Sequence, residues 1–431
     1  MFIFRNSFRV GRFSRMTFSA TQMSRPPIGF PILDEARIVA PGLPSRSDLA
    51  RSVYCVLGIP IDATDISTVV HQVEIAASER APFLISTPNL NFLVSSLLDP
   101  QFRETLLDSD LCPPDGIPIV WIARLLGLPI KERAAGSDLL ERLQTRGAGA
   151  RPLSLFLFGG AEGVAVAAAR KLNACPGDLA CVGALNPGFC DIVEMSQNNV
   201  IDEVNSSGAD FLVVALGAKK GQLWLQHNHN RLTIPIRSHL GAAVNFQAGT
   251  VKRAPPLIRA RGFEWLWRIK EERYLWKRYR DDGIALLRLL ITRVLPLAII
   301  NRWHQIGRKG RVQELLIENI QDDRSITIAL RGTASESQAL TAISYLQKAI
   351  SSDKDIVIDL SDTLRIDARF MGLLLMLRKE LKSRGRKLRF AGATPAIQRI
   401  FRLNEVGFLL SDEAAGSDQQ AARGAAVRSS N

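Results

Sequence analysis

Two loop residues carry side chains that suit group-transfer chemistry. Asp115 lies in a Pro-Asp-Gly segment before an apolar helix, and Arg133 precedes a Gly-Ser-Asp helix start. A positioned carboxylate can take a proton from a hydroxyl group, and a guanidinium can pair with a diphosphate. Structural roles stay open at this point, because a turn aspartate can cap a helix and an arginine can form a surface ion pair.

Two further loops follow apolar strands and precede helices. Gly159, Gly160 and Gly163 lie between LSLFLF and a helix, where backbone N–H groups can approach a phosphate. Tight packing of a strand on a helix also requires glycine, so this pattern alone is a weak signal. Thr87 and Asn89 follow the strand FLIS, and capping of the next helix is the structural alternative for both.

No motif in the sequence requires a metal ion or another cofactor. The candidate loops contain no DxD-like pair that would hold a divalent cation against a diphosphate. The five cysteines lack CxxC spacing, and their odd number argues for a reducing compartment rather than a disulfide framework. His227 and His229 have no acidic or cysteine partner nearby, so we expect a surface helix there.

Short apolar segments alternate with helical ones from Val53 to Gly217. This alternation predicts an α/β fold with a Rossmann-like, mostly parallel sheet that helices cover on both faces. Ligands of such sheets bind beyond the carboxyl ends of the strands. The loops that matter most are therefore 87–91, 159–163, 186–189 and 217–222.

Residues 251–311 form a segment that is both basic and rich in tryptophan. It holds 16 Lys and Arg against 5 Asp and Glu, which is +11 of the net +13, and four of the six Trp residues. Lys and Arg attract anionic headgroups, and Trp rings settle at a membrane interface. Its apolar part is interrupted by Arg288, Arg293 and Pro296, which favours burial in the membrane plane over crossing. A nucleic-acid surface and a core or dimer contact are the alternatives that we consider weaker.

After residue 311 the chain restarts as a smaller α/β unit. The strands SITIALRG, DIVIDLSD and KLRFAGA alternate with expected helices at 336–350, 370–383 and 395–403. We therefore predict a basic disordered arm (1–50), an α/β domain (51–250), the basic helical appendage (251–311), a small α/β domain (312–411) and a disordered tail (412–431).

The first domain resembles the WecG/TagA/CpsF family of bacterial glycosyltransferases. Four segments match in the family's order, namely TPNLNFL, PPDGIPIVWIARLLGLPIKERAAGSDLLERL, LFLFGGAEGVAVAAARKL, and ADFLVVALGAKKGQLW with HLGAAVNFQAGTVKRAPPLIRARGFEWLWR. Family members transfer a sugar from a UDP-sugar to a polyprenyl-diphosphate-linked sugar with inversion. The resemblance therefore implies a peripheral enzyme on the inner face of the cell membrane, which makes a surface polysaccharide and does not bind nucleic acid. It also implies that copies of the chain can self-associate.

The resemblance also implies roles for the candidate residues. Asp115 is expected to be the general base and Arg133 to stabilise the departing UDP, while Thr87 and Asn89 orient the donor. The other residues expected to bind substrate are Gly159, Gly160, Gly163, Lys220, Gln222, Arg253, Arg268, Arg273 and Arg278. The last four belong to the appendage and are expected to bind the lipid diphosphate jointly.

The sequence departs from the family at AKKGQLW, residues 218–224, where most members carry P-x-Q-E-x-W. Lys219, Gly221 and Gln222 take the places of Pro, Gln and Glu, so Gln222 could replace the missing amide only after a shift of one residue. Asn245 stands where the family has Asp. These departures favour a distinct subgroup and leave the identity of the sugar open.

The second unit resembles a STAS domain over IVIDLSDTLRIDARFMGLLLMLRKELKSRGRKLRFAGATPAIQRIFRLNEVGF. The family motif D-S-x-G places a phosphorylatable serine at a helix start. Here Asp367 is followed by Ala368, and Phe370 takes the glycine position. Alanine has no hydroxyl group to phosphorylate, so we expect a docking or regulatory module that binds a protein partner without this switch. The altered AKKGQLW segment favours one alternative function, a catalytically inactive regulatory or scaffold protein that acts through this STAS-like domain.

Overall fold

The computed structural model describes residues 47–147, 151–175, 177–306 and 314–411. The predicted arm up to residue 46 and the tail 412–431 lie outside these ranges. The last residues of the predicted arm lie inside them and correct its boundary. Asp48–Ala50 form the short 3₁₀ helix η1, and its Leu49 is fully buried. The described structure therefore begins before the predicted domain start at residue 51.

The first domain is built on a five-stranded sheet in the order β3-β7-β6-β4-β5, and all its neighbouring strands run parallel. The strands are β3 (Phe83–Ile85), β4 (Leu153–Gly159), β5 (Leu179–Leu185), β6 (Phe211–Ala215) and β7 (Ile236–His239). Strands β3 and β7 are buried along their whole length, as expected for parallel strands with both faces covered. The predicted α/β class and parallel sheet are confirmed.

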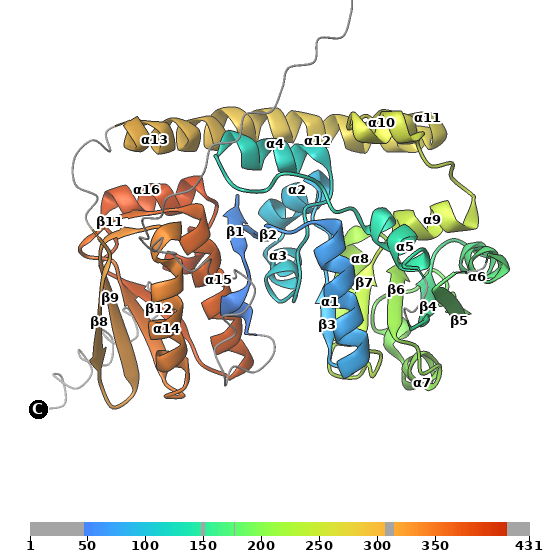
Figure 1. Ribbon diagram of the computed structural model, residues 1–431, viewed down its shortest axis with the longest axis horizontal. Helices are drawn as coiled ribbons and strands as arrows, with labels where there is room; N and C mark the ends of the chain where they lie inside the picture. The colour runs from blue at the N-terminus through green and yellow to red at the C-terminus, as the bar shows by residue number, and fades with distance from the viewer. Residues whose placement is uncertain (1–46, 148–150, 176, 307–313, 412–431) are drawn as a thin grey trace, which may run out of the picture. The chain divides into compact units, whose positions relative to one another are not determined.

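Helices pack on both faces of this sheet (Figure 1). The helices on one face are α1 (Ile66–Glu79), α5 (Gly136–Gln144), α6 (Val164–Ala174) and α9 (Gly241–Ala248). The helices on the other face are α7 (Asn198–Ser206) and α8 (Ala218–His227). The helix after β4 and the helix after β6 thus leave the sheet on opposite sides. Neighbouring strands whose connections diverge in this way open a crevice between their loops.

Directly after η1 the chain forms a β-hairpin that lies apart from the main sheet. Strands β1 (Val53–Val56) and β2 (Ile59–Asp62) pair antiparallel. Tyr54 and Val56 pack with helices of the first domain, whereas Val53 and Cys55 enter the core of the C-terminal domain. The sequence predicted a strand here within the first domain alone. That assignment is corrected, because successive side chains of a strand point to opposite faces and both faces of β1 are buried.

Three helices complete the hydrophobic core beneath the hairpin. They are α2 (Leu90–Leu98), α3 (Pro100–Leu107) and α4 (Ile117–Leu125). Helix α2 begins at Asn89, whose side-chain oxygen accepts the N–H of Phe92 at 3.2 Å. Helix α3 begins at Asp99 in the same manner, with a proline in its first turn.

The C-terminal domain has its own five-stranded sheet, in the order β11-β9-β10-β12 with β8 antiparallel to β9. The strands are β8 (Leu316–Gln321), β9 (Ser325–Ala334), β10 (Asp355–Asp359), β11 (Thr363–Ile366) and β12 (Leu388–Ala391). The helices are α14 (Ala339–Ile350), α15 (Ala368–Ser383), α16 (Pro395–Leu403) and α17 (Phe408–Ser411). Sequence reasoning missed β8, which is mostly exposed, and β11, which is short and follows polar residues.

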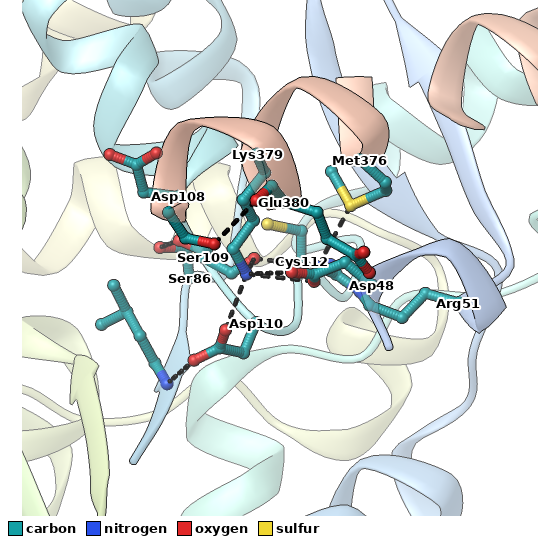
Figure 2. A network of polar contacts seen from close by, with 12 residues as sticks. Asp48, Arg51, Ser86, Asp108, Ser109, Asp110, Cys112, Met376, Lys379 and Glu380 are labelled. Carbon is teal, nitrogen blue, oxygen red and sulfur yellow. Dashed lines mark hydrogen bonds and ion pairs between the residues drawn. The ribbon is translucent and has the colours of Figure 1, made fainter. Parts of the chain in front are cut away.

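Helix α15 joins the two domains. Gly372 lies so close to β1 that a Cβ atom there would be 2.2 Å from the carbonyl oxygen of Val53. Further along the helix, the Lys379 Nζ lies 2.7 Å from Asp110 Oδ1 and 3.0 Å from Asp48 Oδ2 (Figure 2). The contact between the domains therefore has an apolar part and a charged part.

The basic segment is helical through most of its length. Its elements are α10 (Pro256–Ala260), α11 (Glu264–Glu271), η3 (Arg273–Leu275), α12 (Trp276–Leu289), η4 (Leu290–Val294) and α13 (Leu295–Ile306). Segment η4 is a π-helical turn. Pro296 follows it and lacks the N–H that would bond the carbonyl of Thr292, which explains why the α-helical ladder is interrupted here.

The continuous helix Arg273–Trp303, called the long helix from here on, packs one face on the first domain. Leu289, Val294 and Leu297 are buried in the same core as Ile119 and Ile122 of α4. The predicted boundary at residue 251 therefore separates two segments that share a core.

The opposite face carries large apolar side chains at intervals of three or four residues, which places them on one side of a helix. This outer stripe consists of Ile284, Leu287, Ile291, Leu295, Ile299 and Trp303, which are 46–76% exposed. By length and composition alone, Arg273–Trp303 is the one helix in the described ranges that could cross a membrane, and 17% of its most apolar window is buried. Our expectation that it lies in the membrane plane stays a prediction.

Candidate active site

The predicted site loops meet at one edge of the first sheet (Figure 1). Strand β3 leads to Thr87 and Asn89, β4 leads to the glycine loop 159–163, and β6 leads to Gly217 and helix α8. Because these strands are parallel, their carboxyl ends lie at the same edge. The expected crevice lies between the loops after β4 and β6. Strand β7 lies between β6 and β3, so the loop after β3 is one strand further from this crevice.

Backbone hydrogen bonds hold Asp115 between two other candidate loops. Its N–H donates to the carbonyl of Pro88 at 2.9 Å, and the N–H of Ala134 donates to the carbonyl of Pro114 at 2.8 Å. Helix α4 begins at Gly116 without a side-chain cap. The capping role that the sequence left open for Asp115 is therefore wrong, and its carboxyl group has no hydrogen-bond donor among the described residues.

The surroundings of Asp115 suit a proton acceptor. The pKa of this half-buried carboxyl group is raised to about 7, and burial is the largest cause. Arg133 and Arg268 lower the pKa, and the charges of Glu264 and Asp138 raise it. A general base works best when its pKa lies near the working pH. A carboxyl group with this pKa can accept a proton near neutral pH, and the role of Asp115 as the base stays a prediction.

Arg133 lies in an acidic cluster next to Asp115. Its Nη1 donates to Glu264 Oε2 at 2.7 Å, and its Nη2 donates to Asp138 Oδ2 at 3.4 Å. Burial alone would lower the pKa of Arg133, but the carboxylates of Glu264, Asp138 and Asp115 outweigh burial and raise it. The guanidinium is therefore charged, and helix α11 of the appendage reaches it through Glu264.

The loop after β3 contains one buried candidate residue, Thr87, and one residue that caps a helix, Asn89. Thr87 is almost fully buried and packs near Gly136, whose Cβ position would lie 3.6 Å from the Thr87 Cγ2 atom. Asn89 caps helix α2, so the structural alternative for this residue is confirmed. Its role in binding the donor stays a prediction.

The glycine loop has a conformation that other residues rarely adopt. Gly159, Gly160 and Gly163 have φ angles of +93°, +92° and +75°. A Cβ atom at Gly159 would lie 2.6 Å from the Leu216 side chain, and the N–H of Gly160 donates to Ala215 at 2.7 Å. The glycines thus allow close packing of the β4 and β6 ends, which border the expected crevice. Contact with a nucleotide stays a prediction.

On helix α8, the two side chains that were predicted to bind substrate, Lys220 and Gln222, form hydrogen bonds with other parts of the protein. The Lys220 Nζ donates to the carbonyl of Cys190, and Lys219 pairs with Asp99 at 2.6 Å. Gln222 is fully buried, its Oε1 accepts the hydroxyl of Ser86 at 3.1 Å, and its Nε2 has no partner among the described residues. In this conformation Gln222 supports the loop after β3 from beneath and has no exposed surface for a ligand.

The four predicted appendage arginines divide into two pairs. Arg253 contacts Asp138, Glu141 and Ser137, and Arg268 pairs with Glu272 at 2.7 Å. Both lie near the cluster around Asp115, since Arg253 shares Asp138 with Arg133 and Arg268 acts on the pKa of Asp115.

The other pair points to solvent. Arg273 and Arg278 are exposed, and Arg278 lies over the ring of Tyr279 at 5.1 Å. The structure therefore brings Arg253 and Arg268 to the candidate site but not Arg273 and Arg278. A joint role of all four at a lipid diphosphate stays a prediction.

Sequence reasoning missed Glu264. It bonds Arg133 and acts on the pKa of Asp115, yet its only signal in the sequence was its presence as an acid in a basic segment. Asp138 lies in the first turn of α5. In the described residues no three His, Cys, Asp or Glu side chains are grouped so that they could hold a metal ion.

Two protein families match the chain. Residues 54–298 match the glycosyl transferase WecG/TagA/CpsF family, and residues 319–411 match a family described as Mlab, STAS domain. These ranges correspond to the first domain with most of the appendage and to the C-terminal domain.

Two relatives carry the name N-acetylglucosaminyldiphosphoundecaprenol N-acetyl-β-D-mannosaminyltransferase. The protein from Bacillus spizizenii is 26% identical over 218 residues, which cover 51% of this chain and 82% of the relative. The protein from Bacillus subtilis is 24% identical over 195 residues, which cover 45% of this chain and 74% of the relative.

A solved structure also resembles part of the chain. It is the Bacillus cell fate determinant SpoIIAA in the phosphorylated form, with 18% identity and a TM-score of 0.20, and the match covers 24% of this chain and 98% of that structure.

Proposed function

Because the chain belongs to the WecG/TagA/CpsF family of glycosyltransferases, we propose that it transfers a sugar from a UDP-sugar to a polyprenyl-diphosphate-linked saccharide, with inversion at the anomeric carbon. The names of both relatives support the acceptor class, since they specify a diphosphoundecaprenol-linked N-acetylglucosamine. The product belongs to the synthesis of a surface polysaccharide, such as an exopolysaccharide, capsule or wall polymer.

The observation that carries this proposal is the raised pKa of the Asp115 carboxyl group in its half-buried loop. An acceptor hydroxyl attacks the anomeric carbon as the bond from that carbon to the UDP oxygen breaks. The carboxylate of Asp115 takes the hydroxyl proton, and the negative charge leaves with UDP. A pKa of about 7 lets Asp115 hold that proton during the step and release it afterwards near neutral pH.

Arg133 is the residue that stabilises the leaving group. A guanidinium presents five N–H donors in a planar fork that matches the oxygens of a diphosphate. In the structure two of its nitrogens bond Glu264 and Asp138. A diphosphate therefore competes with Glu264 for Arg133, and binding of UDP and docking of helix α11 affect each other.

The donor binds in the crevice between the loops after β4 and β6. The glycine loop lies at the start of α6, where backbone N–H groups favour a phosphate. Thr87 and Asn89 approach from the loop after β3 and orient the sugar.

The lipid part of the acceptor lies in an apolar groove of about 360 Å³. The groove is lined by Pro118, Trp121, Ile122, Arg124 and Leu125 of α4 and by Leu286 and Leu290 of the long helix. It starts one helical turn after Asp115, so an isoprenoid chain in it can leave its diphosphate near the base. Trp121 and Leu125 are 52% and 50% exposed, which makes the groove open to a membrane.

The outer stripe rests on the inner face of the cell membrane, with basic residues around it. Contacts along the helix support a position in the membrane plane. Asn91 of α2 donates to Asp282 at 3.4 Å, Arg293 pairs with Glu405, and Arg365 donates to Asn301 at 3.0 Å. A helix held at its start, middle and end by the two α/β domains presents one face to lipid. The enzyme is thus cytoplasmic and peripheral.

A transfer assay tests the function. Labelled UDP-sugars are offered one by one with a polyprenyl-diphosphate-linked acceptor to the wild type and to Asp115→Asn. We expect product from one donor in the wild type and a loss of roughly 100- to 10,000-fold in the variant, the range typical of a general base.

The exposed Asp281→Asn variant is the matched control and should keep full activity. Equal product from wild type and Asp115→Asn would remove Asp115 from its role. No product from any donor, with folded protein, would favour the scaffold alternative.

The groove has its own test. Trp121→Ala should raise the KM for a long-chain acceptor about tenfold, because a buried aromatic contact contributes on the order of 1.5–3 kcal/mol. It should leave the KM for a water-soluble acceptor with a short chain unchanged. An equal change for both acceptors would show that Trp121 does not contact the lipid chain.

A further inference from the structure

A basic pocket lies where the first domain, the long helix and the C-terminal domain meet. Its volume is about 560 Å³, within the range of small-molecule sites. It is lined by Arg103 of α3, Arg293 of η4, and Arg399, Arg402, Leu403, Glu405, Gly407 and Phe408 of the C-terminal domain. None of these residues belongs to the candidate active site.

The charges of the pocket do not balance. Four of its lining residues are arginines and one is a glutamate. Glu405 pairs with Arg293, while Arg399 and Arg402 are exposed and have no carboxylate partner within the described ranges. Like charges repel one another in a concave site, so this arrangement favours a bound anion.

Arg103 is the least satisfied of the four arginines. Its guanidinium carbon lies 3.8 Å from the centre of the Phe408 ring, which holds the side chain in place. Its Nε is buried and has no hydrogen-bond partner in the part of the chain that the structure describes. A buried donor without an acceptor is costly, and a small shift of the Arg103 side chain toward an anion oxygen in the pocket would supply one.

We propose that this pocket binds a phosphate-bearing anion with at least two negative charges. Guanidinium groups pair with phosphate oxygens through parallel hydrogen bonds, and several arginines around one cavity favour a polyvalent anion. Because the lining comes from α3, η4 and α16–α17, the bound anion holds the C-terminal domain and the long helix against the first domain.

Two sources could supply this chemistry. One is a soluble phosphate compound, such as a diphosphate. The other is an anionic phospholipid headgroup, because η4 belongs to the same helix as the outer stripe. The experiment therefore has a soluble arm and a membrane arm.

Full-length protein is titrated with inorganic pyrophosphate by calorimetry and, separately, floated with vesicles that contain phosphatidylglycerol. The variant Arg399→Gln/Arg402→Gln removes two exposed arginines of the pocket. The control Arg324→Gln/Arg384→Gln removes the same charge from exposed positions outside it. Circular dichroism melting curves establish that both double variants are folded.

We expect the pocket variant to lose at least about tenfold in affinity in one arm, while the control stays near wild type. Loss in the pyrophosphate arm identifies a soluble ligand, and loss in the vesicle arm alone identifies a headgroup. Equal loss in both double variants would mean that only net charge matters and would overturn the proposal. Absence of any difference between wild type and pocket variant in both arms would overturn it as well.

Discussion

Helix α15 and the long helix Arg273–Trp303 are both rich in large apolar residues, yet their surroundings differ. Ten of the 16 residues of α15 are buried, because β1 packs on one side and the C-terminal sheet on the other. Only 17% of the most apolar window of the long helix is buried. Two apolar helices of this chain therefore have different surroundings. Helix α15 lies between two domains, whereas the long helix has one face that lacks a protein partner in the described residues.

The charged residues of the two helices differ in the same way. The basic residues Arg378, Lys379 and Lys382 of α15 pair with Glu104, Asp108, Asp110 and Asp48 of the first domain. On the long helix, Lys277 and Arg278 are exposed. Charges on α15 thus fix one domain to the other. On the long helix Arg293 also pairs with Glu405 of the C-terminal domain, whereas Lys277 and Arg278 point to solvent.

The largest effect on stability is expected at Lys379. Lys379→Ala removes two ion pairs from a mostly buried contact, although Arg51 still pairs with Asp48 and the N–H of Leu84 still donates to Asp110. The free energy of unfolding should therefore fall by about 2–3 kcal/mol. Urea denaturation measures this loss. The control Lys277→Ala on the long helix should leave the unfolding midpoint unchanged, and equal effects of both variants would refute the difference between the helices.

A glycine in each helix allows a second comparison. Gly372→Ala places a Cβ atom 2.2 Å from the Val53 carbonyl oxygen and should destabilise the protein by about 1–3 kcal/mol. At Gly283 nothing lies within 4 Å of the added atom. Gly283→Ala should therefore stabilise the protein by about 0.5–1 kcal/mol, through helix propensity. Thermal unfolding of both variants decides the point, and a destabilised Gly283→Ala would mean that the long helix has a partner there.

Serine substitutions on the outer stripe should separate folding from membrane binding. Leu287→Ser/Ile291→Ser should leave the unfolding midpoint almost unchanged, because both side chains are more than half exposed. Flotation with anionic vesicles should fall roughly 10- to 100-fold, since each lost side chain contributes on the order of 1.5 kcal/mol or more when buried in lipid. Unchanged flotation would show that the stripe does not contact the membrane.

Most elements of the fold were predictable from the sequence. The strands LSLFLF and ADFLVVALG are short apolar runs between helices, and this pattern predicts parallel strands. The contacts of β1 were not predictable. All four of its residues are apolar, and a strand buried on both faces does not reveal which domain covers which face.

The candidate site was predictable in part. The position of Asp115 in a loop and its family resemblance pointed to the base, but the hydrogen bond from its N–H to Pro88 depends on the fold. The contact of Glu264 with Arg133 joins residues 131 positions apart and requires the appendage to dock. Gln222 was expected at the ligand, and only the packing of α8 reveals that it is buried under Ser86.

In the C-terminal domain, too, the sequence predicted the helix but not the packing around it. Asp367 caps α15 through the N–H of Phe370 at 2.9 Å, and Ala368 follows it where a phosphorylatable serine was expected from the resemblance. The adjoining helix face is covered by β1 of the same chain. A protein partner of this domain, which stays a prediction, would have to bind another surface.

The pH dependence of kcat/KM is the most direct test of Asp115 as the base, because it reports the pKa of the essential group in the free enzyme. The wild type should lose activity as the pH falls through about 7, where Asp115 becomes protonated. Arg133 lowers and Glu264 raises that pKa, so this acid limb should move to higher pH in Arg133→Gln and to lower pH in Glu264→Gln. A limb that stays in place in both variants, or moves in the same direction, would contradict the assignment.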